Sequence, residues 1–296
     1  MPNLSAKLGF GPQERLLIVH ADDAGMCHSA NAATIRAMTE GVVSSTSVMV
    51  PCPWFPEFAA WARDNPQMDV GIHLTLTSEW QHYRWGPVAP GDKVPGLVDD
   101  EGFLWHRVED VATRATPDEV ERECRAQIER ALESGIRPTH IDSHMGTLFA
   151  RPDYFAVYIR LSREYGIPAM LPRPTPDLLE RADAPAGVID RLAALESEGF
   201  LFLDRLVLSL AGDTLEQRRE SLHRMLRSLE PGVTQLIVHL LQDDPEARHI
   251  AGSWRTRVVE LELCIEPETR RIIEEEGIRL IGYRPLVERW PKEARA

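Results

Sequence analysis

The chain has 296 residues, of which 43% are hydrophobic and 27% charged, a composition typical of a globular protein with a large core. Its net charge of −13 disfavours binding to nucleic acid or to an anionic membrane, because both require a cationic surface. This length suits one α/β barrel, so we expect a single domain over residues 1–296 rather than two domains.

The four cysteines are widely separated and form no C-x-x-C pair, which favours reduced thiols over a disulfide framework or a structural zinc site. Residues 1–11 lack the cationic start and apolar run of a secretory signal. No apolar stretch approaches the roughly 20 residues that span a bilayer. We therefore expect a cytoplasmic protein, and a homodimer is compatible with these features.

Short apolar runs alternate with longer amphipathic segments along the chain. The expected strands are residues 15–20, 45–50, 70–74, 140–141, 169–171, 206–208, 236–240 and 279–281. The expected helices are residues 29–40, 55–65, 117–134, 152–165, 186–198, 215–229 and 266–275. This alternation predicts an α/β fold with a mostly parallel sheet covered by helices, and the number of units favours closure into a barrel of about seven strands.

One segment interrupts this alternation. Residues 79–105 are rich in Trp, Pro and Gly and show no clear periodicity, so we expect a long loop insertion over one end of the barrel. Trp80, Trp85 and Trp105 in this segment could stack on a sugar ring, or could simply cover the barrel mouth. Arg173 follows the expected strand at residues 169–171, where it could bind a substrate anion, orient a carboxylate or lie on the surface.

Residue types that bind metals stand where four apolar runs end. The runs are V-H-A-D-D at residues 19–23, V-G-I-H-L at 70–74, T-H-I-D-S-H at 139–144 and L-I-V-H-L at 236–240. The carboxyl ends of parallel strands converge on one face of a barrel, so residues distant in sequence can meet there.

If Asp23, His73 and His144 meet around one divalent cation, they leave coordination positions for water and substrate, as a catalytic site requires. The cation would also offset the repulsion between Asp23 and its neighbour Asp22. Asp22 would then be free to accept a proton from a water whose pKa the metal lowers.

Each of these features also has a purely structural explanation. The Asp22–Asp23 pair can cap a helix, and His73 can be a hydrogen-bonded core histidine. The alternating residues His140, Asp142 and His144 can share one strand face in a polar network without a metal. Together, however, the four run endings favour a metal site.

At these residues the chain resembles the YdjC-like carbohydrate deacetylases, relatives of the NodB-type polysaccharide deacetylases. The resemblance rests on A-D-D-A-G at residues 21–25, the stretch at 31–49, V-G-I-H-L-T-L-T at 70–77, R-P-T-H-I-D-S-H at 137–144 and L-S-R-E-Y-G-I-P at 161–168. It covers the first 175 residues well, and the order and spacing of the motifs are more specific than any single motif.

The resemblance implies a distorted (β/α) barrel that removes acetyl groups from N-acetylated sugars or oligosaccharides. Asp23, His73 and His144 would then hold one divalent metal ion, Zn or Mg, and Asp22 would be the base. The late histidine of the family would correspond to His239, which would protonate the departing amine or stabilise the oxyanion.

Two departures from the family pattern concern substrate selectivity. The family continues D-S-H-x-H, whereas Gly146 replaces the second histidine here, and H-L-L-Q-D-D at residues 239–244 replaces H-P-G. Two other functions remain open: a metal hydrolase of another acyl or phosphate ester, and a non-catalytic sugar- or metal-binding protein on a degenerate barrel. Retention of both Asp22 and Asp23 speaks against a protein that only binds.

Overall fold

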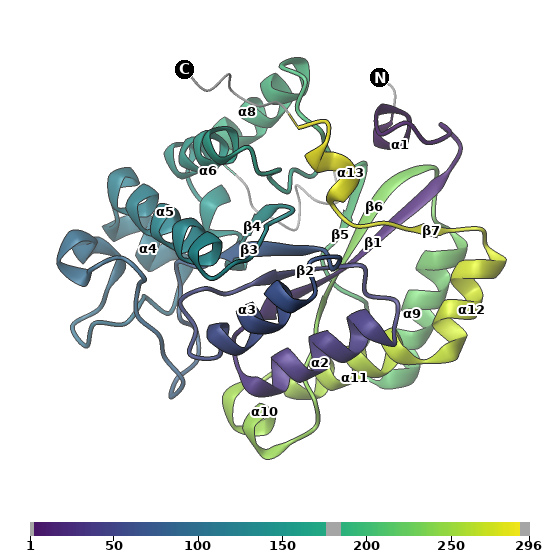
Figure 1. Cartoon of the computed structure of the whole chain (residues 1–296), viewed down its shortest axis with the longest axis horizontal. Helices are drawn as coiled ribbons and strands as arrows, with labels where there is room; N and C mark the ends of the chain where they lie inside the picture. Colours follow the sequence, from purple (N-terminus) through teal and green to yellow (C-terminus); the bar gives the residue numbers. More distant parts are fainter. Residues whose placement is uncertain (1–2, 176–184, 291–296) are drawn as a thin grey trace.

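The computed structural model describes residues 3–175 and 185–290 (Figure 1). Within these residues, one parallel sheet is formed by β1 (Arg15–Ala24), β2 (Ser45–Val48), β3 (Val70–Leu74), β4 (Ile141–Ser143), β5 (Arg205–Val207), β6 (Gly232–His239) and β7 (Arg279–Leu280). The strand order is β4-β3-β2-β1-β6-β5, with β7 paired to β1. The long strands β1 and β6 cross the centre of the molecule side by side.

The two outer strands, β4 and β5, are joined through residues 169–172 and 203. Ile141 of β4 bridges to Ala169, and Pro172 bridges to Leu203, two residues before β5. These contacts curl the sheet into a distorted barrel, which confirms the predicted fold. The strand predicted at 169–171 forms only isolated bridges, because the prolines on either side of it, Pro168 and Pro172, have no N–H to donate to a ladder.

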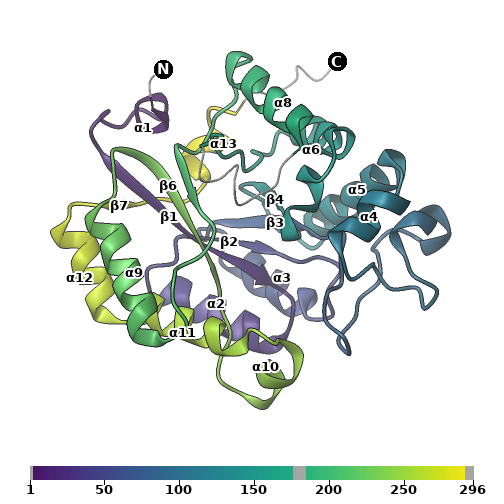
Figure 2. The ribbon, with the colours of Figure 1, turned by 180° about the vertical axis from the view of Figure 1, so that it is seen from behind.

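Helices surround this sheet on its outer side (Figures 1 and 2). They are α1 (Leu4–Lys7), α2 (His28–Thr39), α3 (Phe55–Asp64), α4 (Val108–Arg114), α5 (Pro117–Glu133), α6 (Pro152–Tyr165), α8 (Ala186–Ser197), α9 (Leu215–Arg227), α10 (Pro245–Ile250), α11 (Trp254–Ile265), α12 (Pro267–Glu275) and α13 (Arg284–Val287). Helix α5 begins with a capping box, in which Thr116 and Glu119 satisfy each other's backbone N–H groups.

The central strand β1 is buried on both faces, and its side chains alternate between two environments. Leu17, Val19 and Ala21 pack in an apolar cluster with residues of α2, α9, α11 and α12. His20 and Asp22 have the opposite parity and face the barrel interior. Strand alternation thus places His20 and Asp22 inside the barrel, while Leu17, Val19 and Ala21 pack against the helices.

Helix α11 was not predicted from the sequence. Its buried side chains include Arg257 and Glu260 beside leucines, and Ser253 makes no capping bond to its first turn. The usual signals of a helix, an apolar stripe and an N-cap, are therefore weak here.

The segment at residues 79–105 lies between β3 and α4. It contains the short 3-10 helices η1 (Gly91–Lys93) and η2 (Pro95–Leu97) and an antiparallel bridge between Val98 and Leu104. No helix in the described part of the chain is both long enough and apolar enough to cross a bilayer.

Candidate metal centre

An irregularity in β1 aims two adjacent carboxylates into the barrel. Ala21 pairs with Thr46 and Ala24 with Val48, so β1 contains one more residue than β2 in this interval. Asp23 lies in the bulge and has a φ of 66°, a left-handed conformation that Asp adopts more readily than most residues. In a regular strand the two side chains would point to opposite faces, but here Asp22 and Asp23 both line the same cavity.

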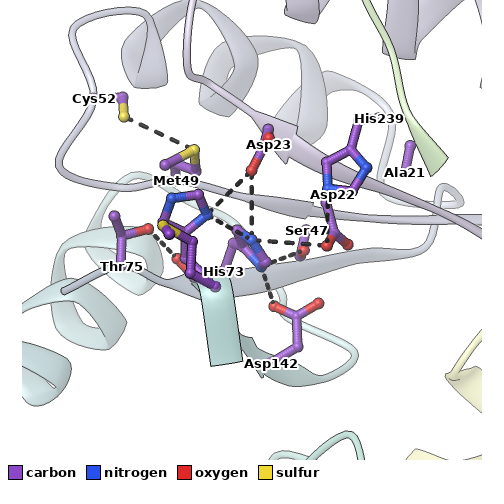
Figure 3. Close-up of polar contacts among 12 residues, drawn as sticks. Ala21, Asp22, Asp23, Ser47, Met49, Cys52, His73, Thr75, Asp142 and His239 are labelled. Atoms are coloured by element: carbon purple, nitrogen blue, oxygen red, sulfur yellow. Dashed lines mark hydrogen bonds and ion pairs between the residues drawn. The ribbon is translucent and has the colours of Figure 1, made fainter. Parts of the chain in front are cut away.

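Asp23, His73 and His144, which we call the triad, meet as predicted at the ends of β1, β3 and β4. Figure 3 shows Asp23 beside His73. Oδ1 of Asp23 lies 3.5 Å from Nε2 of His73 and 3.3 Å from Nδ1 of His144. The two ring nitrogens are 3.2 Å apart. Three potential ligand atoms therefore form a nearly equilateral triangle.

This triangle fits a divalent cation. Ligand atoms about 2.1 Å from a tetrahedral cation are separated by about 3.4 Å, close to the spacing observed. Oδ1 of Asp23 is also buried without a hydrogen-bond partner, so it is available to a ligand. The nearby polar group of His20, His140 and Asp142 is also compact, but neither His20 nor His140 lines the cavity.

In each histidine of the triad, the ring nitrogen that faces away from Asp23 contacts a carboxylate, which orients the ring. Oδ1 of Asp142 lies 2.7 Å from Nδ1 of His73, and Oε2 of Glu79 lies 3.0 Å from Nε2 of His144. Figure 3 shows the His73 ring between Asp23 and Asp142. Such carboxylate partners fix the ring orientation and increase the basicity of the nitrogen that binds a metal.

Neighbouring charges shift the pKa values of the triad residues. Burial raises the pKa of Asp23, but Arg257 and His144 outweigh it and hold that pKa well below its usual range. Arg257, from α11, donates to Oδ2 of Asp23 at 2.7 Å, which leaves Oδ1 to face the histidines. Burial lowers the pKa of His144, but Glu79 and Asp23 raise it to about 10.

Asp22 lies beside the triad and between two further histidines. Its Oδ2 is 3.9 Å from Nε2 of His73 and 3.8 Å from Nε2 of His239. Its Oδ1 is 3.2 Å from Nε2 of His20, which also contacts Asp142 at 3.0 Å. Burial lowers the pKa of His20, but its bonds to Asp142 and Asp22 raise it to about 10, so this ring is a cation that holds the two carboxylates together.

A cavity of about 770 Å³ opens onto these groups. Asp22, Asp23, His73, His144 and His239 all line it, so the structure brings together all the residues predicted for catalysis and metal binding. The volume suits a small-molecule substrate.

The residues predicted to bind substrate do not line this cavity. Trp85 is only 2% exposed and its indole N–H donates to the carbonyl of Thr77, so its ring has no free face for a sugar. Arg173 forms ion pairs with Asp204 and Glu196 at 2.8 Å each. Burial therefore argues against a sugar platform at Trp85, and Arg173 orients two carboxylates, which was one of the roles expected of it. Trp80 is partly buried, with the guanidinium of Arg257 5.7 Å from its ring.

Glu79, Asp142 and Arg257 contact the triad but were not predicted as site residues. The sequence contained an indication for Asp142, since it alternates with His144 at the end of one strand. Glu79 stands at the start of an aperiodic loop, and Arg257 lies in a helix that was not predicted, 234 residues after Asp23. Neither of these two could be singled out by spacing.

The fold and the site define a (β/α)-barrel protein with a candidate metal centre at the carboxyl ends of its strands. Residues 16–275 match the model of the family described as YdjC-like protein. The chain belongs to the YdjC-like family, which confirms the resemblance found in its motifs.

Relatives of known description support this assignment. The chain is 33% identical to a carbohydrate deacetylase of Thermus thermophilus over an alignment of 296 positions that covers 99% of each chain. It is 30% identical to a chitooligosaccharide deacetylase of Serratia marcescens over 278 residues, covering 92% of this chain and 100% of the relative. A crystal structure from Enterococcus faecalis, described as a candidate cellobiose-phosphate cleavage protein, superimposes with a TM-score of 0.77 at 28% identity and covers 92% of this chain and 99% of its own.

Proposed function

We propose that this protein is a metal-dependent carbohydrate deacetylase that hydrolyses the amide bond of N-acetylated sugars. The observation that carries the proposal is the triangle of ligand atoms from Asp23, His73 and His144, 3.2–3.5 Å apart, with the carboxylate of Asp22 beside it in one cavity. The deacetylase relatives support amide hydrolysis over ester or phosphate hydrolysis. A spare carboxylate beside the triad favours catalysis over binding alone.

Asp23, His73 and His144 would hold one divalent cation. When bound, that cation polarises the acyl oxygen and lowers the pKa of the attacking water. One carboxylate and two imidazoles suit Zn, and Mg is the other metal that we predict.

Asp22 acts as the general base. Its buried carboxylate lies close to the triad without contributing to the triangle, so it can take a proton from the attacking water. His20 holds Oδ1 of Asp22, which keeps Oδ2 directed towards His73 and His239.

His239 provides the proton for the departing amine. Its Nε2 is 3.8 Å from Oδ2 of Asp22, and its side chain is partly exposed to the cavity. The backbone N–H of His239 donates to Oε2 of Glu260 at 2.7 Å, which anchors the end of β6. Asp22 and His239 would therefore act as base and acid from atoms that lie 3.8 Å apart in the same cavity.

The test is acetate release from a panel of N-acetylated mono- and oligosaccharides, before and after removal of metal with a chelator. We expect release that stops with the chelator and returns when Zn²⁺ or Mg²⁺ is added. Phosphate release from sugar phosphates without acetate release would instead support a phosphate hydrolase. A cytoplasmic location and a homodimer remain predictions.

A further inference from the structure

The cavity has a second wall that the reaction proposed above does not use. This wall is formed by β5 and the residues after it, β6, α8 and the segment that closes the barrel: Leu206, Leu208, Ile237, Leu192, Met170 and Pro172. We call these six residues the aliphatic wall.

The aliphatic wall is continuous with the metal centre. Ile237 and His239 stand two residues apart on β6 and both line the cavity, so their side chains share one face of the strand. Leu206 of β5 is paired with Gln235 of β6, which places the two strands edge to edge at this point. The wall therefore begins beside the residue that we propose protonates the departing amine.

The wall is incompletely covered by the described part of the protein. Leu206, Leu208 and Met170 are partly exposed, although all three are apolar. Val207, between the two leucines, packs instead against the helix-covered cluster on the other side of β5. Exposed aliphatic surface inside a cavity favours a ligand that removes it from water.

Few groups along the wall could bind the hydroxyls of a sugar chain. The polar residues that line the cavity gather at the metal centre, apart from Glu109 of α4 and Ser143, whose Oγ accepts a bond from the N–H of Leu148. Gly146 also lines the cavity, at the position where the family pattern has a histidine. A Cβ there would meet nothing within 4 Å, so no other side chain fills this space. Buried hydroxyls would remain unpaired against such a wall.

Resting on the proposed deacetylase function, we propose that the substrate is an N-acetylated amino sugar that carries an aliphatic group on the sugar side of the amide. The aliphatic group would lie on Leu206, Leu208 and Ile237. It belongs on the sugar side because the wall adjoins His239, which faces the departing amine rather than the acyl group.

The first test compares kcat/KM for the methyl, butyl and hexyl glycosides of N-acetylglucosamine. Each methylene that the wall covers should raise kcat/KM roughly fourfold, so a hexyl group with two or three of its additional methylenes covered should gain about 16- to 64-fold over methyl. The methyl glycoside of N-hexanoylglucosamine is the second arm. A gain in that arm alone would place the aliphatic chain on the acyl side and overturn the assignment, and no gain in either arm would overturn the proposal entirely.

Variants of the wall provide the second test. Leu206→Gln and Leu208→Gln should each lower the hexyl-to-methyl ratio of kcat/KM about tenfold, whereas Leu208→Met should preserve it. The ratio is measured in one preparation, so it does not depend on how much of a variant is folded. Leu132→Gln is the matched control, because Leu132 is 42% exposed and does not line the cavity. An unchanged ratio in both wall variants would contradict the proposal.

Calorimetric binding separates failure of this inference from failure of the deacetylase assignment. The Asp22→Asn variant should bind the hexyl glycoside at least tenfold more tightly than the methyl glycoside, and Leu206→Gln should remove the difference. This result would support binding of the aliphatic group to the aliphatic wall even if no acetate were released. Equal binding of both glycosides would refute it even in an active deacetylase.

Discussion

Oδ1 of Asp142 lies 2.7 Å from Nδ1 of His73, and this contact determines that Nε2 of the ring faces Asp23. The same carboxylate contacts His20 through its other oxygen, so one buried acid positions a predicted metal ligand and the cation that steadies the base. Its charge is maintained because His73 and His20 outweigh the effect of burial and lower the pKa of Asp142.

Asp142→Asn tests this orienting role. The variant keeps an acceptor oxygen of the same shape but loses the charge, so we expect metal affinity to fall about 10- to 100-fold while the fold is retained. Chelator competition measures the affinity, and circular dichroism checks the fold. Wild-type affinity in this variant would show that Asp142 has only a structural role.

Metal affinity should rise with pH. In the metal-free protein the pKa of His144 is about 10, so near neutral pH a cation must displace its proton. The apparent affinity should increase about tenfold per pH unit for each proton released, from pH 6 towards 9. Calorimetry in buffers with different ionisation heats measures this release, and Glu79→Gln should flatten the slope because Glu79 raises the pKa of His144. An affinity that is constant over this range would contradict the assignment of His144 as a ligand.

Asp22→Asn should separate binding from catalysis. Asp22 lies outside the triangle of ligand atoms, so the variant should retain metal but lose about 10²- to 10⁴-fold in kcat. Asp243→Asn is the control, because Asp243 is exposed and pairs only with Arg248 among the ion pairs of the described chain. Loss of metal with retained turnover would reverse the roles of Asp22 and Asp23.

His239→Gln should impair departure of the amine. We expect kcat to fall about 10²-fold for an N-acetyl sugar. The loss should be smaller for an acetanilide-type substrate, whose leaving group needs less help from an acid. His249→Gln is a suitable control, since His249 is exposed on α10. Equal losses for both kinds of substrate would argue that His239 stabilises the acyl oxygen or acts structurally instead.

Gly71→Ala tests the packing behind the metal centre. A Cβ at Gly71 would lie 2.4 Å from ring atoms of His140, which is itself stacked on Tyr283. The strand cannot accept this atom without moving the ring, so we expect a loss of about 1–3 kcal/mol in the free energy of unfolding. Gly91→Ala should be nearly neutral by the same denaturant titration, since a Cβ there meets nothing within 4 Å. Equal stability of the two variants would refute the close packing of His140 on Gly71.

The sequence was informative about the metal centre because strand ends are visible in a hydrophobic pattern. His73 and His144 each stand where an apolar run ends, and parallel strands bring such ends together. The inward direction of Asp23 was not predictable, because it depends on the extra residue that β1 contains relative to β2. Period-two alternation alone would have sent Asp22 and Asp23 to opposite faces.

Residues that reach the site from helices and loops escaped sequence analysis. Arg257 belongs to a helix whose buried face carries charged side chains, so no apolar stripe marks it. Trp85 illustrates the opposite error: aromatic composition suggested an exposed platform, but only tertiary packing determines that its ring is buried.

Metal stoichiometry in the wild-type protein and in Asp23→Ala, His73→Ala and His144→Ala tests the central claim most directly. We predict about one divalent ion per wild-type chain and a large loss of bound metal in each variant, with the folded state confirmed by circular dichroism. Full retention of the ion by all three folded variants would show that these side chains do not hold it.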